Sequence, residues 1–169
     1  FMTRGESLRR VFLPESLQWG NYLKAWQEAD FGLYFENSLI IAVIQVSGTL
    51  LFSLLAAYPL ARMEFRGRDT VFAGVLATLM IPETVTIVPN FLTITWLHRN
   101  MPFAWLNNWP AMTIPFMASA FSIFLLRQFM RGIPNELWDS ARIDGAGHVR
   151  FLFQILMPLC RAPLLTVGM

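Results

Sequence analysis

Charge is scarce in this sequence. Only 14% of its 169 residues are charged and 55% are hydrophobic, whereas a soluble domain carries about 25% charged residues. The charges are also clustered, so that residues 37–61 and 103–126 contain none and residues 70–97 contain one. Each of these runs exceeds the roughly 20 apolar residues that cross a bilayer as a helix. The composition therefore disfavours a soluble core and predicts an all-α, polytopic bundle of transmembrane helices.

The hydrophobic runs predict about three complete spans and the start of another. We expect the spans at about 37–61, 70–97 and 103–126. The last run, about 152–169, is too short to cross by itself. The chain begins at Phe1 rather than at a methionine and ends without a polar tail. We interpret it as a fragment of a longer chain, with residues 1–36 preceding a transmembrane domain at 37–169.

Residues that carry chemistry are equally sparse. The single cysteine, Cys160, has no partner for an internal disulfide, and the two histidines, His98 and His148, fall in loops on opposite faces. The one lysine, Lys24, is followed by Ala25, so no phosphate-cradling Gly-x-x-x-x-Gly-Lys run is present. We therefore expect no enzyme active site, no metal site, no bound cofactor and no nucleic-acid partner. If ATP drives this protein, another chain must hydrolyse it.

The distribution of arginine predicts the orientation. Segments 62–69 and 127–150 are rich in arginine, whereas the turn around residues 98–101 holds only Arg99. Cytoplasmic loops of membrane proteins carry an excess of basic residues. We therefore expect segments 62–69 and 127–150 in the cytoplasm and residues 1–36 outside.

One acidic residue, Glu83, stands inside a predicted span. A carboxylate in a membrane is costly, so we expect it to face the bundle interior or water. It either pairs with a polar group across a helix interface or lines a translocation path, with Asn90 as the second candidate lining residue; proton coupling is a third interpretation. The prolines Pro82 and Pro89 remove backbone donors and are expected to kink this span.

A short polar helix is predicted between the third span and the last hydrophobic run. Pro134 suits the first turn of a helix, and Glu136 and Asp139 favour the positive end of the helix dipole. Gly145 can adopt the left-handed conformation that ends a helix. The pattern predicts about two and a half turns and then a second helix from near Gly147. A helix lying on the membrane surface and a helix that docks a cytosolic partner both agree with it.

The same stretch resembles the EAA loop of ATP-binding-cassette importer permeases. The family pattern is Glu-Ala-Ala, three residues, Gly, nine residues and Ile-x-Leu-Pro. This chain has Asp139-Ser140-Ala141, three residues, Gly145, nine residues and then Ile155-Leu156-Met157-Pro158. The departures, Asp139 for Glu, Ser140 for Ala and Met157 for Leu, preserve shape and the sign of the charge.

Sequences around this core are similar to the carbohydrate-importing branch of these permeases. They are Ile133-Pro134, Glu136-Leu137, Ile143-Asp144-Gly145-Ala146, Asn37-Ser38-Leu39, Ala57-Tyr58-Pro59-Leu60-Ala61-Arg62 and Met80-Ile81-Pro82. The resemblance thus extends over nearly the whole chain.

The resemblance implies a fold and a set of partners. The fold is a permease-type helix bundle in the lipid of a bacterial or archaeal cytoplasmic (inner) membrane. A second permease subunit completes the path, an ATP-binding-cassette ATPase dimer uses the ATP, and an extracytoplasmic solute-binding protein delivers the solute. Displacement of a rigid coupling helix would switch the two-state bundle.

The resemblance also implies roles for particular residues. The residues implied to dock on the ATPase are Glu136, Leu137, Asp139, Ser140, Ala141, Asp144 and Gly145. Ala141 would allow close approach of the partner, and Ile155 and Pro158 would form the turn from the loop into the next span. Two alternatives are a proton-coupled secondary transporter that uses Glu83 and a non-transporting membrane scaffold.

Overall fold

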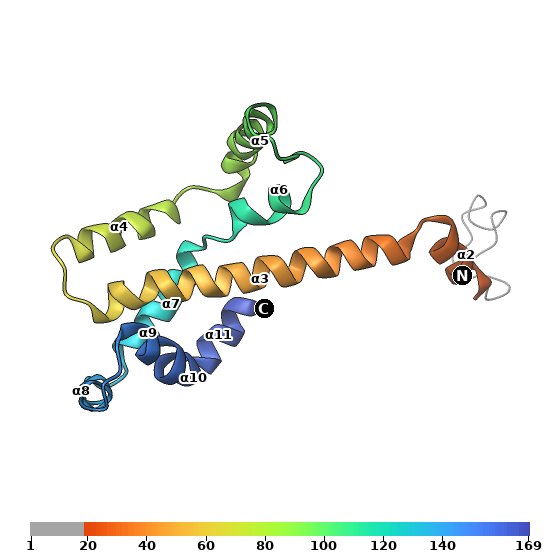
Figure 1. Ribbon diagram of the computed structural model, residues 1–169. Coiled ribbons are helices and arrows are strands. Elements are labelled where there is room, and N and C mark those ends of the chain that lie inside the picture. Colours follow the sequence, from red (N-terminus) through yellow and green to blue (C-terminus); the bar gives the residue numbers. More distant parts are fainter. Residues whose placement is uncertain (1–18) are drawn as a thin grey trace. The chain divides into compact units, whose positions relative to one another are not determined.

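A computed structural model of the chain describes residues 19–169 (Figure 1), and every regular element in that range is helical. The elements are α2 (Gly20–Glu28), α3 (Phe31–Arg62), α4 (Arg68–Thr78), α5 (Glu83–Asn100), α6 (Trp109–Thr113), the 3-10 turn η1 (Ile114–Phe116), α7 (Ala120–Arg131), α8 (Glu136–Ile143), α9 (His148–Phe151), the π turn η2 (Leu152–Leu156), α10 (Met157–Leu159) and α11 (Arg161–Gly168). The all-α prediction is confirmed. Residues 1–18 of the expected extracytoplasmic segment lie outside the described residues.

The structure divides into two units, residues 1–40 and 41–169. In the first unit, aromatic rings pack beside one another along α2 and the start of α3. Trp19 stacks on Tyr22 with 6.3 Å between ring centroids, and Trp26 stacks on Phe31 at 6.0 Å. Such rings favour the membrane–water interface, where the apolar face is sheltered and the polar atom is wet.

Within the described residues only α3 is long and apolar enough to cross a membrane as a single helix, and up to four stretches qualify if each bent helix pair counts as one span. The other three are helix pairs, with bends of 96° between α4 and α5, 47° before α7 and 80° before α11. The expected spans 70–97 and 103–126 each contain one of these breaks. The first break lies at Pro82, which stands before α5 with an extended backbone (ψ 137°), so the kink expected there is confirmed. Pro89, by contrast, lies inside the continuous helix α5.

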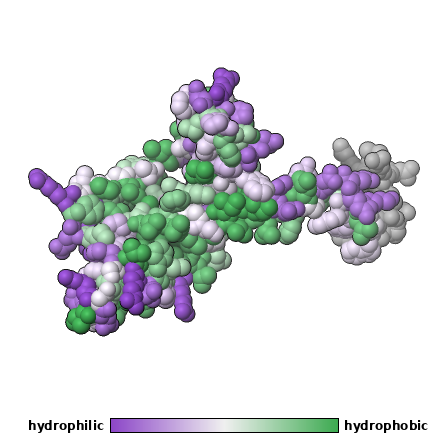
Figure 2. Space-filling model, viewed as in Figure 1, coloured by the Kyte–Doolittle hydropathy of each residue, from purple (hydrophilic) through white to green (hydrophobic). Residues whose placement is uncertain are grey.

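The core of the second unit lies where the C-terminal end of α3 meets α7, α8 and α9 (Figure 1). Its buried apolar residues are Leu54, Ala57, Tyr58, Leu126, Met130, Ala141, Phe151, Leu152, Leu156 and Cys160. Away from this core many apolar side chains are exposed, and Figure 2 shows a largely hydrophobic surface along α3. Such a surface suits lipid, because lipid tails are as apolar as the side chains.

A buried arginine joins three helices beside this core. Arg127 of α7 is only 4% exposed. Its Nε donates to the carbonyl oxygen of Leu60 at 3.1 Å, and one of its terminal nitrogens lies 3.4 Å from Asp69 at the start of α4. Its guanidinium carbon also lies 3.6 Å from the centre of the Phe72 ring. These contacts fix α7 against the end of α3 and the beginning of α4.

Phe151 provides a test of this core. Its side chain is fully buried, whereas that of Phe153 is 38% exposed. Phe151→Ala leaves a cavity and should lower the free energy of unfolding by about 3–5 kcal/mol. Phe153→Ala should cost less than half as much, because its side chain is already partly in contact with the surrounding detergent. Denaturant titration of the detergent-solubilised protein, followed by helical circular dichroism, measures both; equal losses would contradict the packing.

Candidate functional site

The segment between α7 and α9 carries the helix that the sequence predicts. Helix α8 runs from Glu136 to Ile143, with Asn135 before it and with Glu136 and Asp139 in its first turn. Acidic groups in this position are favoured by the helix dipole. The sequence predicted Pro134 in the first turn of this helix, but Pro134 lies before Asn135 and therefore outside that turn. The predicted helix itself is confirmed.

The end of α8 is a Schellman motif. The backbone N–H of Gly145 donates to the carbonyl of Arg142 at 3.0 Å, and that of Ala146 donates to the carbonyl of Ala141 at 2.8 Å. This pair of bonds requires a left-handed residue at the first position after the helix cap. Gly145 has φ +75°, so the conformation predicted for it is confirmed. The motif satisfies carbonyl groups that the helix end would otherwise leave free.

Helix α8 has a sharply divided surface. Ala141 is buried (4% exposed) and Trp138 is half-buried. The exposed residues are Glu136, Leu137, Asp139, Ser140, Arg142, Ile143 and Asp144, and Figure 2 shows polar residues gathered around this helix. The expectation that Ala141 offers a surface for a partner needs correction, because its small side chain lets α8 approach the chain's own core. The other residues predicted to dock remain accessible.

Aromatic rings form the seat beneath α8. Trp138 stacks on His148 of α9, with centroids 4.6 Å apart and planes 22° apart, and meets Phe151 edge-on at 4.9 Å. The Tyr58 hydroxyl of α3 lies 2.6 Å from Nδ1 of His148. When His148 is neutral and carries its proton on Nε2, this hydroxyl donates to Nδ1. The seat thus connects α8 and α9 to the end of α3.

Arg62, the last residue of α3, holds the segment before α8. Its two terminal nitrogens donate to the carbonyl oxygen of Ile133 and to Oδ1 of Asn135, each at 2.6 Å. The sequence places Tyr58 and Arg62 in a stretch that resembles carbohydrate permeases, and Arg62 among the loop charges, but it predicts no contact for either residue. One signal was available, because the two polar residues are four apart at the end of an apolar run, which places them on one helix face.

The remaining predicted residues lie elsewhere. Ile155, in the π turn η2, is partly buried against the core, whereas Pro158 in α10 is exposed. Glu83 is the first residue of α5 and exposed, directly after the 96° bend, and Asn90 is half-buried. Their spacing of seven residues puts Glu83 and Asn90 on one face of α5.

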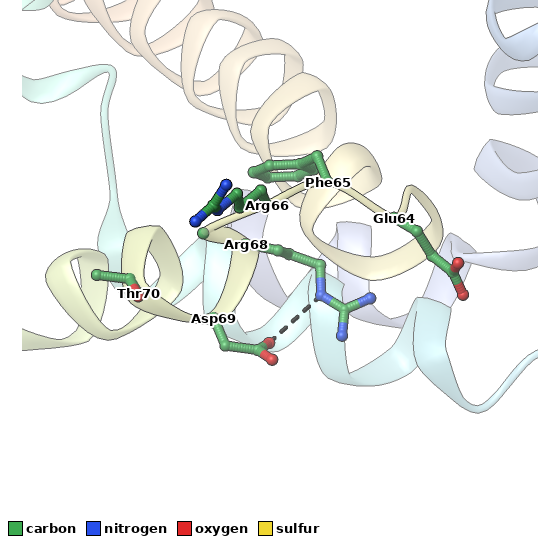
Figure 3. A pocket seen from close by; sticks show the side chains of 7 residues that line it. Glu64, Phe65, Arg66, Arg68, Asp69 and Thr70 are labelled. Atoms are coloured by element: carbon green, nitrogen blue, oxygen red, sulfur yellow. Dashed lines mark hydrogen bonds and ion pairs between the residues drawn. The ribbon is translucent and has the colours of Figure 1, made fainter.

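The loop between α3 and α4 forms a shallow hollow lined by residues 64–70 (Figure 3). Most of these residues are exposed, and the Arg68 Nε lies 3.3 Å from Asp69. Asp69, in the first turn of α4, also pairs with the buried Arg127 and thereby ties α4 to α7. Within residues 19–169, no group of three or more His, Cys, Asp or Glu side chains is arranged to hold a metal ion.

Comparison with known proteins identifies the family. Residues 30–168 match the profile of the binding-protein-dependent transport system inner membrane component. The chain belongs to this family of importer permeases. A permease of this kind is a membrane component without an enzymatic role of its own.

Named relatives include permease proteins of transport systems for oligosaccharides and for a polyol phosphate. The chain is 36% identical over 99% of its length to the diacetylchitobiose uptake system permease protein of Streptomyces coelicolor. It is 35% identical over 91% of its length to the sn-glycerol-3-phosphate transport system permease protein of Pectobacterium atrosepticum. An arabinooligosaccharide permease of Halalkalibacterium halodurans is 36% identical over 88% of the chain.

A solved structure shares the fold of this permease. It is a bacterial ABC transporter involved in import of the acidic polysaccharide alginate, which superposes with a TM-score of 0.80 at 27% identity and covers 94% of the chain. The chain spans about half the length of these relatives: 55% of the first two, 52% of the third and 54% of the alginate transporter chain.

Gly145 and Gly147 form a matched pair for testing the end of α8. A Cβ would meet no atom within 4 Å at either position, but only Gly145 has a positive φ. Gly145→Ala should therefore lower the free energy of unfolding by about 1–2 kcal/mol, the cost of a left-handed alanine. Gly147→Ala should stay within about 0.5 kcal/mol. Denaturant titration of both variants measures the difference, and equal costs would contradict the assigned backbone conformation.

Proposed function

We propose that this chain is part of the permease subunit of an ATP-driven, binding-protein-dependent importer. In this proposal residues 127–150 are cytoplasmic and α8 docks on a separate ATPase, while a second permease subunit and an external solute-binding protein complete the importer. Family membership supports the general role. The observation that carries the coupling role is the geometry of α8: its exposed face combines charged residues with the apolar Leu137 and Ile143, while Trp138 and Ala141 pack it on the core.

This geometry suits a helix that passes on a displacement. A helix merely adsorbed on lipid would turn its apolar side toward the membrane and would need no fixed attachment to the bundle. Helix α8 instead buries Ala141, and it ends in a hydrogen-bonded motif at Gly145. Because a packed interface responds as a unit rather than by gradual deformation, pushing on α8 would displace the core on which it rests.

The proposed solute is a carbohydrate or a closely related polar metabolite. The relatives are named for diacetylchitobiose, sn-glycerol-3-phosphate and arabinooligosaccharides, and the alginate importer shares the fold. Glu83 and Asn90 are the proposed path-lining residues of this chain. Their common face on α5, at a break in a membrane-crossing stretch, agrees with the rule that irregular backbone in membranes lines a cavity or is buried in protein.

Uptake by reconstituted vesicles tests the proposal. The full-length permease, assembled with its partners, should import a labelled member of a panel (diacetylchitobiose, sn-glycerol-3-phosphate, an arabinooligosaccharide) when ATP is supplied on the ATPase side. A protonophore should leave the rate within about twofold, since no proton gradient supplies the energy. Uptake that ignored ATP and collapsed with the protonophore would instead favour a proton-coupled transporter using Glu83.

Charge reversal on α8 tests the docking surface. Glu136 and Asp139 are exposed and neighbour each other across one turn. Reversing both (Glu136→Lys with Asp139→Lys) should weaken binding of the ATPase about tenfold or more, since like charges at an interface repel. Glu64→Lys, at another exposed acidic residue in the other arginine-rich loop, is the control and should bind nearly as the wild type does. Co-purification of the ATPase at increasing salt gives the comparison; undiminished binding by the double variant would rule out this face.

A further inference from the structure

Two side chains of α3 hold both sides of the segment that carries α8. Tyr58 and Arg62 are four residues apart and therefore lie on the same helix face. Arg62 holds the chain before α8, through the Ile133 carbonyl and the Asn135 side chain, each at 2.6 Å. Tyr58 holds the chain after α8, through Nδ1 of His148 at 2.6 Å.

The connections on either side of α8 would be pliable without these contacts. Gly132 ends α7, and Gly147, with an extended backbone (ψ 174°), precedes α9. Glycine restricts the backbone least of all residues, so a push on α8 could be absorbed by rotation at these two positions. The attachment of Arg62 lies beyond Gly132, on the side of α8. The attachment of Tyr58 reaches α8 across Gly147, because Trp138 stacks on His148.

The chemistry of the two contacts suits a rigid link. A guanidinium is planar and presents its donors in a fixed fork, so two simultaneous bonds determine its direction as well as its distance. The phenol of Tyr58 is held by packing, since its ring lies tilted against that of Phe151, with 6.5 Å between centroids, and the residue is only 4% exposed. Both side chains are thus held by packing or by paired bonds.

We propose that Tyr58 and Arg62 form a clamp that transmits the displacement of α8 to α3, which makes α3 the membrane helix that receives the movement. The inference rests on the proposed function, in which α8 docks on an ATPase. Tyr58 and Arg62 are positioning residues, because they act through the α8 segment and not on solute or ATP. Losing the clamp should uncouple ATP hydrolysis from transport without stopping hydrolysis.

The assembled importer in liposomes provides the test, with solute uptake from the panel above and ATP hydrolysis measured on the same sample. Tyr58→Phe removes one hydroxyl and keeps the ring, so uptake per ATP hydrolysed should fall about fivefold, the factor that one hydrogen bond contributes. Arg62→Ala removes two bonds and should lower the ratio about tenfold or more. Arg62→Lys, which can keep one bond, should fall between the wild type and Arg62→Ala.

Two controls match these changes. Thr95→Val removes a hydroxyl whose bond, to the Phe91 carbonyl at 2.8 Å, stays within α5. Arg66→Ala removes an exposed arginine one turn's length beyond Arg62 in the sequence. Both should keep the ratio within about twofold of the wild type. An unchanged ratio of uptake to ATP hydrolysis in the clamp variants would overturn the proposal. This includes the case in which uptake and hydrolysis fall equally, which would indicate a merely structural role.

A reporter on α3 separates failure of the clamp from failure of the proposed function. Leu55 is 45% exposed on α3, whereas the native Cys160 is fully buried. In the Leu55→Cys importer, the rate of labelling by a thiol reagent should change when ATP is added, and Tyr58→Phe or Arg62→Ala should abolish that change. A wild type without uptake of any panel member would refute the proposed function. The clamp would be refuted if ATP did not change the labelling rate in the Leu55→Cys importer with Tyr58 and Arg62 intact. It would also be refuted if the change persisted in the clamp variants.

Discussion

The second unit depends on the burial of polar groups at one end of α3. Leu60 offers a backbone carbonyl there to the buried Arg127, Tyr58 offers a hydroxyl, and Arg62 offers two donors. A polar group buried without a partner costs more than the bond itself contributes. These groups are satisfied only when α7 and the chain on either side of α8 lie where the structure places them. The hydrogen-bond requirements of one helix end thus select the arrangement of its neighbours.

Apolar packing alone would select that arrangement less sharply. Between helices in lipid, hydrophobic association provides little net drive, and specificity comes from close packing and hydrogen bonds. The core beneath α8 supplies both kinds of constraint. Ala141 is small enough to let the helix backbone approach, and Trp138 stacks on His148 and meets Phe151 edge-on. A helix that is mostly polar can therefore be held firmly on a membrane protein while presenting its charges to a partner.

The sequence predicted the elements whose signals are local. The uncharged run ending at Ala61 indicated the long helix α3, and Gly145 indicated the end of α8. Pro82 indicated the break before α5, although not its 96° bend, because a bend angle depends on packing on both sides. Two features could not be predicted, because they depend on the tertiary arrangement. One is the burial of Ala141 against the core, and the other is the bond between Arg62 and Asn135, which are 73 residues apart in the sequence.

Helical periodicity gives the spacing of Tyr58 and Arg62 a consequence for chain length. Each residue of an α-helix advances the side-chain direction by about 100°. One residue added to or removed from the turn between them would rotate the guanidinium by about 100° relative to the phenol and so away from its present partners. Pro59, inside this turn, lacks a backbone N–H, but the clamp uses only the side chains of Tyr58 and Arg62 and does not need that donor. Substitutions there are therefore easier to accommodate than insertions or deletions: in this stretch the count of residues is more constrained than their identity.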